Sequence, residues 1–395
     1  MKALRRYIDK IKPNFSKGGR FEMFHSTFDA FETFLFVPDR VTSRGAHIRD
    51  ALDMKRTMAL VVLATIPALC FGIWNAGYQH FLSTGIQAAF WETIWFGFLK
   101  VFPIIVVSYV TGLGIEFAFA QIRKHDVNEG FLVTGMLIPL IMPVDVPLWM
   151  VAVSTAFAVI IGKEVFGGTG MNIWNPALIA RAFLFFAYPS EMSGDLVWIA
   201  GLKGGENVID GFSGATILAQ AAAGKSAFVN GAGDSFTLWD MFIGTIPGSI
   251  GETSTLAILL GAALLIYTGI GSWKIMMSVF AGGAIMGMIL NLFAVNEFMR
   301  VPFWEQLIIG GFAFGAVFMA TDPVTASQTE KGKWIYGLLI GILAILIRVI
   351  NPAFPEGMML SILFMNTFAP LIDHYVVEAN VKKRLKRAVK AKHIK

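Results

Sequence analysis

The sequence predicts an all-α polytopic membrane protein of about ten transmembrane helices, arranged as two inverted five-helix repeats. Hydrophobic residues make up 55% of the 395 residues, and the mean hydropathy of +0.64 exceeds what a soluble domain can cover. Charged residues account for only 15% and gather in the tails and short loops. Hydrophobic segments form two sets of five, separated by a polar, Gly- and Ala-rich stretch over 189–254.

Each set contains segments of a length that suits helices. The first set covers 57–79, 93–119, 130–143, 147–163 and 174–188, and the second covers 255–270, 274–293, 305–320, 334–350 and 357–373. Segments 130–143 and 147–163 are short for a bilayer about 30 Å thick at 1.5 Å per residue, and Pro139, Pro143 and Pro147 punctuate them. Because short or broken helices at membrane depth are tolerated only inside protein or beside a cavity, we expect that setting for both.

The placement of basic residues predicts the orientation in the membrane. With the N-terminus inside, the even-numbered connections are cytoplasmic, and these carry Arg123-Lys124, Lys163, Lys274, Lys331 and Lys333. By the positive-inside rule, both termini are then cytoplasmic and the long central loop lies on the outer face. The net charge of +5 comes largely from the two termini, so it does not indicate nucleic-acid binding.

The expected domains follow these segments. Residues 1–55 form a cytoplasmic head that begins with a basic amphipathic helix rather than a cleavable signal, since it has no continuous apolar core. The other parts are the first five-helix repeat (56–188), the central outer-face loop (189–254), the second repeat (255–375) and a basic cytoplasmic tail (376–395). Cys70 is the only cysteine, and one thiolate cannot supply a zinc or iron–sulfur site by itself.

Asn-Pro-Ala occurs at 175–177 and again at 351–353, and each copy is expected to open the fifth segment of its half. Asn as N-cap with Pro in the first turn is a helix-start signal. Five spans per half invert the second copy relative to the first, as in many transporters whose sites lie at the repeat interface. Aquaporins also have two such boxes, but this chain is too long for six spans and its second box lacks a following Arg.

The most specific motif is the stretch 210–216, which reads Asp-Gly-Phe-Ser-Gly-Ala-Thr in the central loop. It resembles the D-x-x-[S/T]-G-A-T signature at which bacterial flavin transferases join FMN to a threonine through a phosphoester. The Thr216 hydroxyl can attack a pyrophosphate, and Ser213, Gly214 and Ala215 leave room for the transferase and the isoalloxazine ring. Asp210 completes the pattern. The alternative is an ordinary solvated Ser/Gly turn.

Over nearly its whole length, the sequence resembles the family of B-type subunits of the bacterial Na⁺-translocating NADH:quinone oxidoreductases. The stretches that carry the resemblance are Gly18-Gly19, Arg-Lys-His-Asp-Val-Asn-Glu-Gly (123–130), Lys-Glu-Val-Phe-Gly-Gly-Thr-Gly (163–170), 174–188, the flavin motif (210–216) and Ala-Thr-Asp-Pro-Val (320–324). The D-type component of the related Rnf complex shares the ten-span core and the flavin motif but normally lacks a head like residues 1–55.

The resemblance implies covalent FMN on Thr216, a non-covalent riboflavin and quinone as substrate, with no catalytic side chain of the chain's own. It implies electrons that arrive from a flavin-bearing C-type subunit near the outer face and reduce quinone toward the cytoplasm, coupled to Na⁺ export. The implied partners are the A-type subunit, the D-type and E-type membrane subunits, the NADH-oxidising F-type subunit and a flavin transferase. The implied location is the bacterial inner membrane.

Sodium binds oxygen ligands, so carboxylates near or inside spans are candidates for its pathway. Asp322, at the end of a span, is the strongest candidate, and a helix-cap or turn role is its alternative. Glu129, with Gly130 at a cytoplasmic span start, either guards a sodium or quinone entrance or caps that helix. Asp373 closes the last span as a pathway acid or an interfacial helix end. Asp29 stands in the N-terminal aromatic segment where the family carries an acidic residue. No resident metal is expected beyond transported Na⁺.

A Gly-rich turn includes Gly167 and Gly168, where the backbone can approach a flat ligand closely. Both are therefore candidates for flavin contacts, and plain helix packing is the alternative. Glu164, Glu116 and Lys100 are interpreted as structural. Lys100 and Glu116 are about 24 Å apart along one helix, so they are expected to reach the membrane interfaces separately.

Two other functions stay open at this point. The first is a D-type subunit of an Rnf ferredoxin:NAD⁺ complex, which uses no quinone. The second is a flavin-free channel or solute transporter on the same inverted-repeat scaffold, in which the 210–216 motif is a chance turn.

Overall fold

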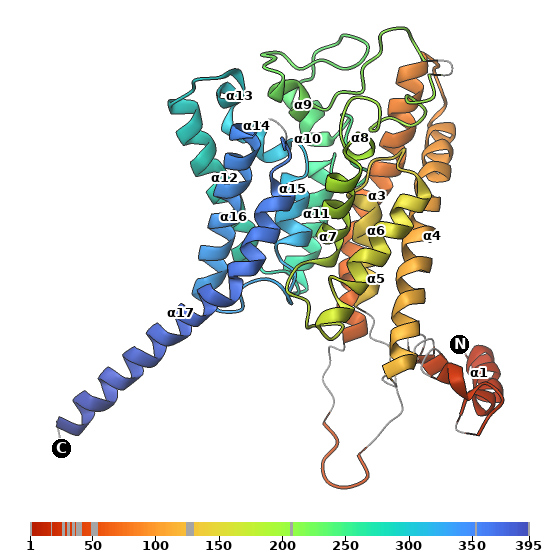
Figure 1. The fold of residues 1–395 in the computed structure, drawn as a ribbon, viewed down its shortest axis with the longest axis vertical. Helices are drawn as coiled ribbons and strands as arrows, with labels where there is room; N and C mark the ends of the chain where they lie inside the picture. The colour runs from red at the N-terminus through yellow and green to blue at the C-terminus, as the bar shows by residue number, and fades with distance from the viewer. Residues whose placement is uncertain are drawn as a thin grey trace.

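The computed structural model describes residues 2–16, 18–25, 28–29, 32–33, 36, 42–48, 54–123, 130–205, 208–351 and 354–393. Within these ranges the chain is a bundle of helices with long connections at one end (Figure 1). Six helices are long and apolar enough to cross a membrane, and three shorter apolar helices accompany them. The predicted class, an all-α polytopic membrane protein, is confirmed.

Every predicted hydrophobic segment overlaps a helix. In the first half these are α3 (Met54–Thr84), α4 (Phe90–Arg123), α5 (Phe131–Leu140), α6 (Leu148–Ile160) and α7 (Pro176–Ala187). In the second half they are α11 (Thr255–Tyr267), α12 (Trp273–Leu292), α14 (Phe303–Ile308) with α15 (Phe312–Phe314) and the π-helical turn η3 (Gly315–Met319), α16 (Glu330–Ile350) and α17 (Met358–His393). As the prolines indicated, α5 is short, with 10 residues. The 13 residues of α6 continue as further turns to Phe166, and this segment of 19 residues is one of the six that could cross a membrane.

The two halves share part of their packing. In the first half, the second segment (α4) packs against the fourth (α6), and the fourth packs against the fifth (α7). In the second half, the corresponding helices α12, α16 and α17 make the same two contacts. Across the halves, α3 packs against α11 and α7 against α17. One hydrophobic cluster runs through both halves, so the two halves share a single core.

Three details differ from the sequence expectations. The segment predicted over 305–320 is not one helix, because Gly310, at φ +65°, interrupts it between α14 and α15. The last helix does not end near 373 but continues through the basic tail as one helix of 36 residues. The second Asn-Pro-Ala box does not open α17, since Asn351 follows the last turn of α16 with extended backbone and α17 begins only at Met358.

The two ends of the bundle carry different features (Figure 1). Both chain termini lie at one end, where α1 (Lys2–Phe15) is followed by the short η1 (Glu22–Phe24). The central stretch lies at the other end, with α8 (Pro189–Met192), α9 (Ile217–Ala222) and α10 (Leu238–Ile243), close to α13 (Glu297–Arg300). The side of the membrane on which each end lies stays a prediction from the charge pattern.

Candidate functional site

Thr216 is the N-cap of the short helix α9. Its side-chain oxygen accepts a hydrogen bond from the backbone N–H of Ala219 at 3.2 Å, the usual use of a threonine at this position. Because the oxygen serves only as an acceptor in that bond, its hydroxyl proton is free and the oxygen can form an ester without losing the cap. The sequence motif therefore ends on a fixed, partly exposed hydroxyl.

The rest of the motif is held in place by close contacts. A Cβ on Gly214 would lie 2.9 Å from Leu202 Cδ2 and even closer to the carbonyl oxygen of Asp195, so only glycine fits there. The hydroxyl of Ser213 accepts from the backbone N–H of Ala215 at 3.3 Å. Asp210 is exposed at the start of the motif.

Gln220, which no sequence pattern singled out, anchors the motif. Its buried amide donates to the carbonyl oxygens of Ala215 at 3.1 Å and Val229 at 2.7 Å, and accepts from the Val229 N–H at 3.0 Å. A buried amide satisfied on both sides fixes the loop more firmly than packing alone.

Thr216 lies in the wall of a cavity that we call the Thr216 cavity. It holds about 650 Å³ of empty space, part of it open to the surroundings. Its walls combine apolar side chains with three charged ones from distant parts of the chain. The charged lining residues are Arg181, Glu252 and Glu356, and the apolar ones include Phe185, Met192, Trp198, Ile217, Leu218 and Ile246.

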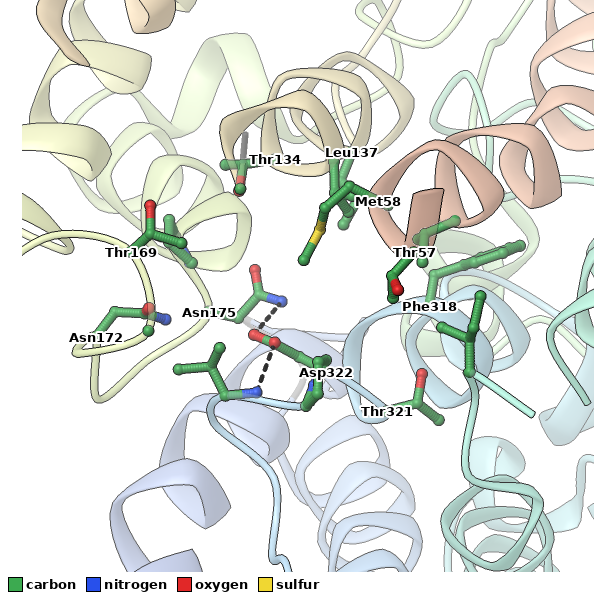
Figure 2. A pocket seen from close by; sticks show the side chains of 18 of the residues that line it. Thr57, Met58, Thr134, Leu137, Thr169, Asn172, Asn175, Phe318, Thr321 and Asp322 are labelled. Atoms are coloured by element: carbon green, nitrogen blue, oxygen red, sulfur yellow. Dashed lines mark hydrogen bonds between the residues drawn. The ribbon is translucent and has the colours of Figure 1, made fainter. Parts of the chain in front are cut away.

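A second cavity, the Asp322 cavity, lies between the two halves (Figure 2). Its polar side chains come from α3 and α5, from the loop between α6 and α7, from the start of α7 and from the turn after η3. Figure 2 shows the Asp322 carboxylate directed at the side chain of Asn175, with Thr169 and Asn172 on the same side. The turn before α16 lies at the end of the bundle away from α9 (Figure 1), so the two cavities are separate sites.

The Asp322 carboxylate joins the two halves. One oxygen accepts from the Val324 N–H at 3.1 Å, and the other accepts from the Thr325 hydroxyl at 3.0 Å and from Asn175 Nδ2 at 3.4 Å. Burial raises the pKa of Asp322 above its ordinary value, and the bonds from Val324 and Thr325 offset only part of that effect. A cation in this cavity would favour the ionised carboxylate.

Asn175 confirms the predicted helix start. Its side-chain oxygen accepts from the N–H groups of Ala177 at 3.0 Å and Leu178 at 3.4 Å, while Pro176 occupies the first helical position. Because the oxygen caps α7, the amide nitrogen points outward and can donate to Asp322. One residue thus both begins a helix and contributes to the cavity.

The remaining candidates differ in where they lie. Gly130 lines the Asp322 cavity, whereas Glu129 is outside the described residues. Gly167 and Gly168 line neither described cavity, although the adjacent Thr169 and Gly170 line the Asp322 cavity.

Asp373 and Asp29 lie away from both described cavities. The Asp373 carboxylate accepts from the Ser327 hydroxyl at 2.6 Å, the Gln328 N–H at 2.7 Å, and the hydroxyl and N–H of Thr329 at 2.6 and 2.9 Å. It therefore fastens the start of α16 to α17. Asp29 is half-buried in the N-terminal head, where its carbonyl accepts from the Thr33 hydroxyl.

The expectation that Glu116 reaches the membrane interface is wrong. Glu116 is 5% exposed and forms a buried ion pair with Lys163, which also lines the Asp322 cavity. Glu164, the residue after Lys163, forms an ion pair with Arg123 at 3.1 Å. Two successive residues of opposite charge thus bind two residues of α4. Sequence spacing alone could not show this, because the partners are 41 or more positions apart.

These features define a class: a polytopic helical membrane protein with a hydroxyl-bearing cavity at one end and a carboxylate-bearing cavity between its halves. The chain belongs to the NQR2, RnfD, RnfE family, whose profile matches residues 41–382.

Curated relatives resemble the chain over almost their whole length. It is 49% identical to the B subunit of the Na(+)-translocating NADH-quinone reductase of Ectopseudomonas mendocina and to that of Azotobacter vinelandii, with 98% of this chain and 100% of each relative covered. It is 48% identical to the protein of the same name from Pseudomonas aeruginosa, covering 98% of this chain and 99% of the relative.

Proposed function

We propose that the chain is the B-type membrane subunit of a Na⁺-translocating NADH:quinone reductase, which passes electrons to quinone and couples that step to Na⁺ export. The observation that carries the proposal is the Thr216 hydroxyl, held by its cap bond at the edge of a cavity, inside a motif that resembles a flavin attachment sequence. Relatives that bear this name match the chain end to end at 49% identity.

The Thr216 cavity suits a flavin joined to Thr216 through its phosphate. The cavity wall offers apolar surface for a flat ring and the guanidinium of Arg181, whose Nε lacks a hydrogen-bond partner among the described residues. An unsatisfied buried donor is costly in a closed protein interior, and a flavin carbonyl or ring nitrogen would satisfy it. In this proposal Thr216 holds FMN, which supplies one-electron transfer, and the motif fixes its attachment point.

We place the non-covalent riboflavin and the sodium path at the Asp322 cavity. Its empty space of about 840 Å³, part of it open to the surroundings, is lined by apolar side chains, by amide, hydroxyl and carboxylate groups from both halves, and by Lys163. Amides and hydroxyls such as those of Asn172 and Thr169 suit the polar edge of an uncharged flavin, while Asp322 supplies oxygen ligands for Na⁺. Gly130 and the preceding Glu129 belong to the quinone or sodium entrance in this proposal, as does the turn with Gly167 and Gly168.

The proposed assembly contains several other subunits. Electrons come from a flavin-bearing C-type subunit, NADH is oxidised on an F-type subunit, and the A-type, D-type and E-type subunits complete the complex, after a flavin transferase has acted on Thr216. The complex lies in the bacterial inner membrane with both termini in the cytoplasm, in keeping with the basic short connections and tail.

The proposal is tested with the purified complex that contains this chain, reconstituted in vesicles. NADH with a water-soluble quinone should drive accumulation of ²²Na⁺, and replacing NADH and quinone with reduced ferredoxin and NAD⁺ should not. Sodium transport with the ferredoxin couple alone would favour the Rnf D-type function. Flux of a solute through vesicles that contain only this chain, without bound flavin, would favour the transporter.

A further inference from the structure

Four charged side chains meet beside the Thr216 cavity, and neither the motif nor the sodium candidates include them. They are Arg181 on α7, Glu252 before α11, Arg348 on α16 and Glu356 in the turn between α16 and α17, and we call them the charge cluster. Arg181 donates to Glu252 Oε1 at 2.7 Å and to Glu356 Oε2 at 2.6 Å. Arg348 donates to the carbonyl oxygens of Gln306 at 2.6 Å and Glu356 at 3.4 Å.

The charge cluster is almost fully removed from solvent. Arg348 is 0% exposed and Arg181 3%, while the Glu356 side chain keeps 20% of its surface accessible. Burying ion pairs of this kind is seldom a source of stability, since apolar replacements of similar volume are often as stable or more so. Two guanidinium nitrogens, Nε of Arg181 and Nε of Arg348, also have no partner among the described residues. A structural role alone does not account for such an arrangement.

The helix break at Gly310-Gly311 brings the charge cluster and Thr216 to one wall. A Cβ on Gly311 would lie 2.7 Å from Glu252 Oε1 and 3.1 Å from Glu356 Oε1, so the carboxylates approach the bare backbone. A Cβ on Gly310 would collide with Leu218, which follows Thr216 by two residues. Both glycines also line the Thr216 cavity. A group that changes its charge inside the Thr216 cavity therefore lies next to the charge cluster.

The charges of the cluster balance only while both carboxylates are ionised. Arg181 and Arg348 contribute two positive charges, and Glu252 and Glu356 two negative ones. Burial raises the pKa of Glu356, the nearby Glu252 raises it further, and the attraction of Arg181 and Arg348 offsets only part of this. These three are the charged groups that face Glu356 from α7, from the turn before α11 and from α16. Glu356 is also the most exposed member of the cluster.

We infer that the charge cluster compensates the charge of the flavin attached to Thr216, with Glu356 as the group that takes up the proton. When one electron from a one-electron donor enters the cavity, the Glu356 carboxylate binds one proton from the outer aqueous phase, forming an O–H bond. The cluster then carries one net positive charge, held by Arg181 and Arg348, beside the added negative charge. On reoxidation Glu356 returns the proton. The inference rests on the proposed function, because it requires flavin at Thr216.

The midpoint potential of the Thr216 flavin should therefore depend on pH through Glu356. In the purified complex near neutral pH, each unit of rising pH should lower the equilibrium constant for one-electron reduction of the flavin about tenfold. For a one-electron couple, this lowers the midpoint potential by about 59 mV. The variant Glu356→Gln keeps an oxygen for Arg181 but cannot ionise, so most of that slope should vanish. Glu297→Gln, the same substitution at an exposed residue paired with Arg300, should keep it.

Two further readouts keep the outcomes apart. A fluorescent band on a denaturing gel reports covalent flavin in each sample, and its absence from wild type would overturn the proposed function and this inference with it. If wild type and Glu356→Gln both carry flavin and show the same slope, the proposed function stands and the inference is wrong. If Glu356→Gln does not assemble, infrared difference spectra of the wild-type complex decide, because reduction must add the signal of a protonated carboxyl and its absence contradicts the inference.

Discussion

Asn175 Nδ2 donates to Asp322 Oδ2 at 3.4 Å, and this bond connects the start of α7 in the first half with the turn that ends η3 in the second. The two residues are 147 positions apart. Since Asn175 also caps α7, a displacement of the Asp322 carboxylate is felt at a helix terminus. In the proposed function, sodium at Asp322 and the position of α7, which carries Arg181 toward the Thr216 cavity, are therefore physically connected.

Replacing Asp322 should weaken sodium dependence specifically. Asp322→Asn preserves the shape of the side chain and an acceptor for Val324, but it removes the charge that a cation requires. We expect the Na⁺ concentration for half-maximal quinone reduction to rise at least tenfold, equivalent to about 1.4 kcal/mol.

Asp373→Asn is the matched comparison, because the Asp373 carboxylate is engaged by residues 327–329. It should lower the unfolding temperature and leave the half-maximal Na⁺ concentration unchanged. An equal rise in both variants would contradict the assignment of sodium to Asp322.

The stability of the protein should depend on the ionisation of Asp322. Burial raises its pKa above the ordinary value of 3.8, so the folded state favours the protonated acid. That favourable contribution is complete below pH 3.8 and is lost as pH rises through the higher folded-state pKa. Without Na⁺, the unfolding temperature of wild type should therefore decrease relative to that of Asp322→Asn as pH rises. Added Na⁺ should reduce this difference in unfolding temperature. A gap that is independent of pH would refute this.

The buried pair of Lys163 and Glu116 should be replaceable as a unit but not in part. Lys163→Met or Glu116→Leu alone leaves an uncompensated buried charge, which typically costs about 3–5 kcal/mol, whereas the double variant should recover most of that loss. Unfolding in detergent measures all three. Lys382→Met, which removes an exposed partner of Glu378, should change stability by no more than about 0.5 kcal/mol. A double variant as unstable as the worse single one would show that the charges are needed.

A bulky residue at 168 should impair the turn that borders the Asp322 cavity. Gly168 has φ +98°, a conformation that costs a branched side chain about 1–3 kcal/mol, and the neighbouring Thr169 and Gly170 line the cavity. We expect Gly168→Val to slow quinone reduction in a fully assembled complex. Normal rates in that complex would show that the turn serves only helix packing.

Local sequence signals predicted those parts of the molecule that depend on local physics. Hydrophobic runs located the helices, Asn175-Pro176 marked the start of α7, and the 210–216 motif pointed to Thr216. The same Asn-Pro signal failed at Asn351, where the preceding helix ends and 352–353 fall outside the described residues. A start signal cannot by itself specify how far the next helix lies.

Contacts between distant segments could not be predicted. Arg181 lies in an apolar run and its partners Glu252 and Glu356 are 71 and 175 positions away, so no spacing reveals the charge cluster. The pair of Lys163 and Glu116 was missed for the same reason. Buried charges in apolar helices are a warning that such partners exist, but only the fold identifies them.

The most direct test of the central claim is covalent flavin on Thr216. The chain should be co-expressed with a flavin transferase, as wild type, Thr216→Ala and Thr216→Ser, and each should be run on a denaturing gel under ultraviolet light. We predict a fluorescent band for wild type, none for Thr216→Ala, and a band of reduced intensity for Thr216→Ser, which keeps the hydroxyl. A dark wild-type band, with the transferase shown to be active on another substrate, would contradict the redox function proposed for this chain.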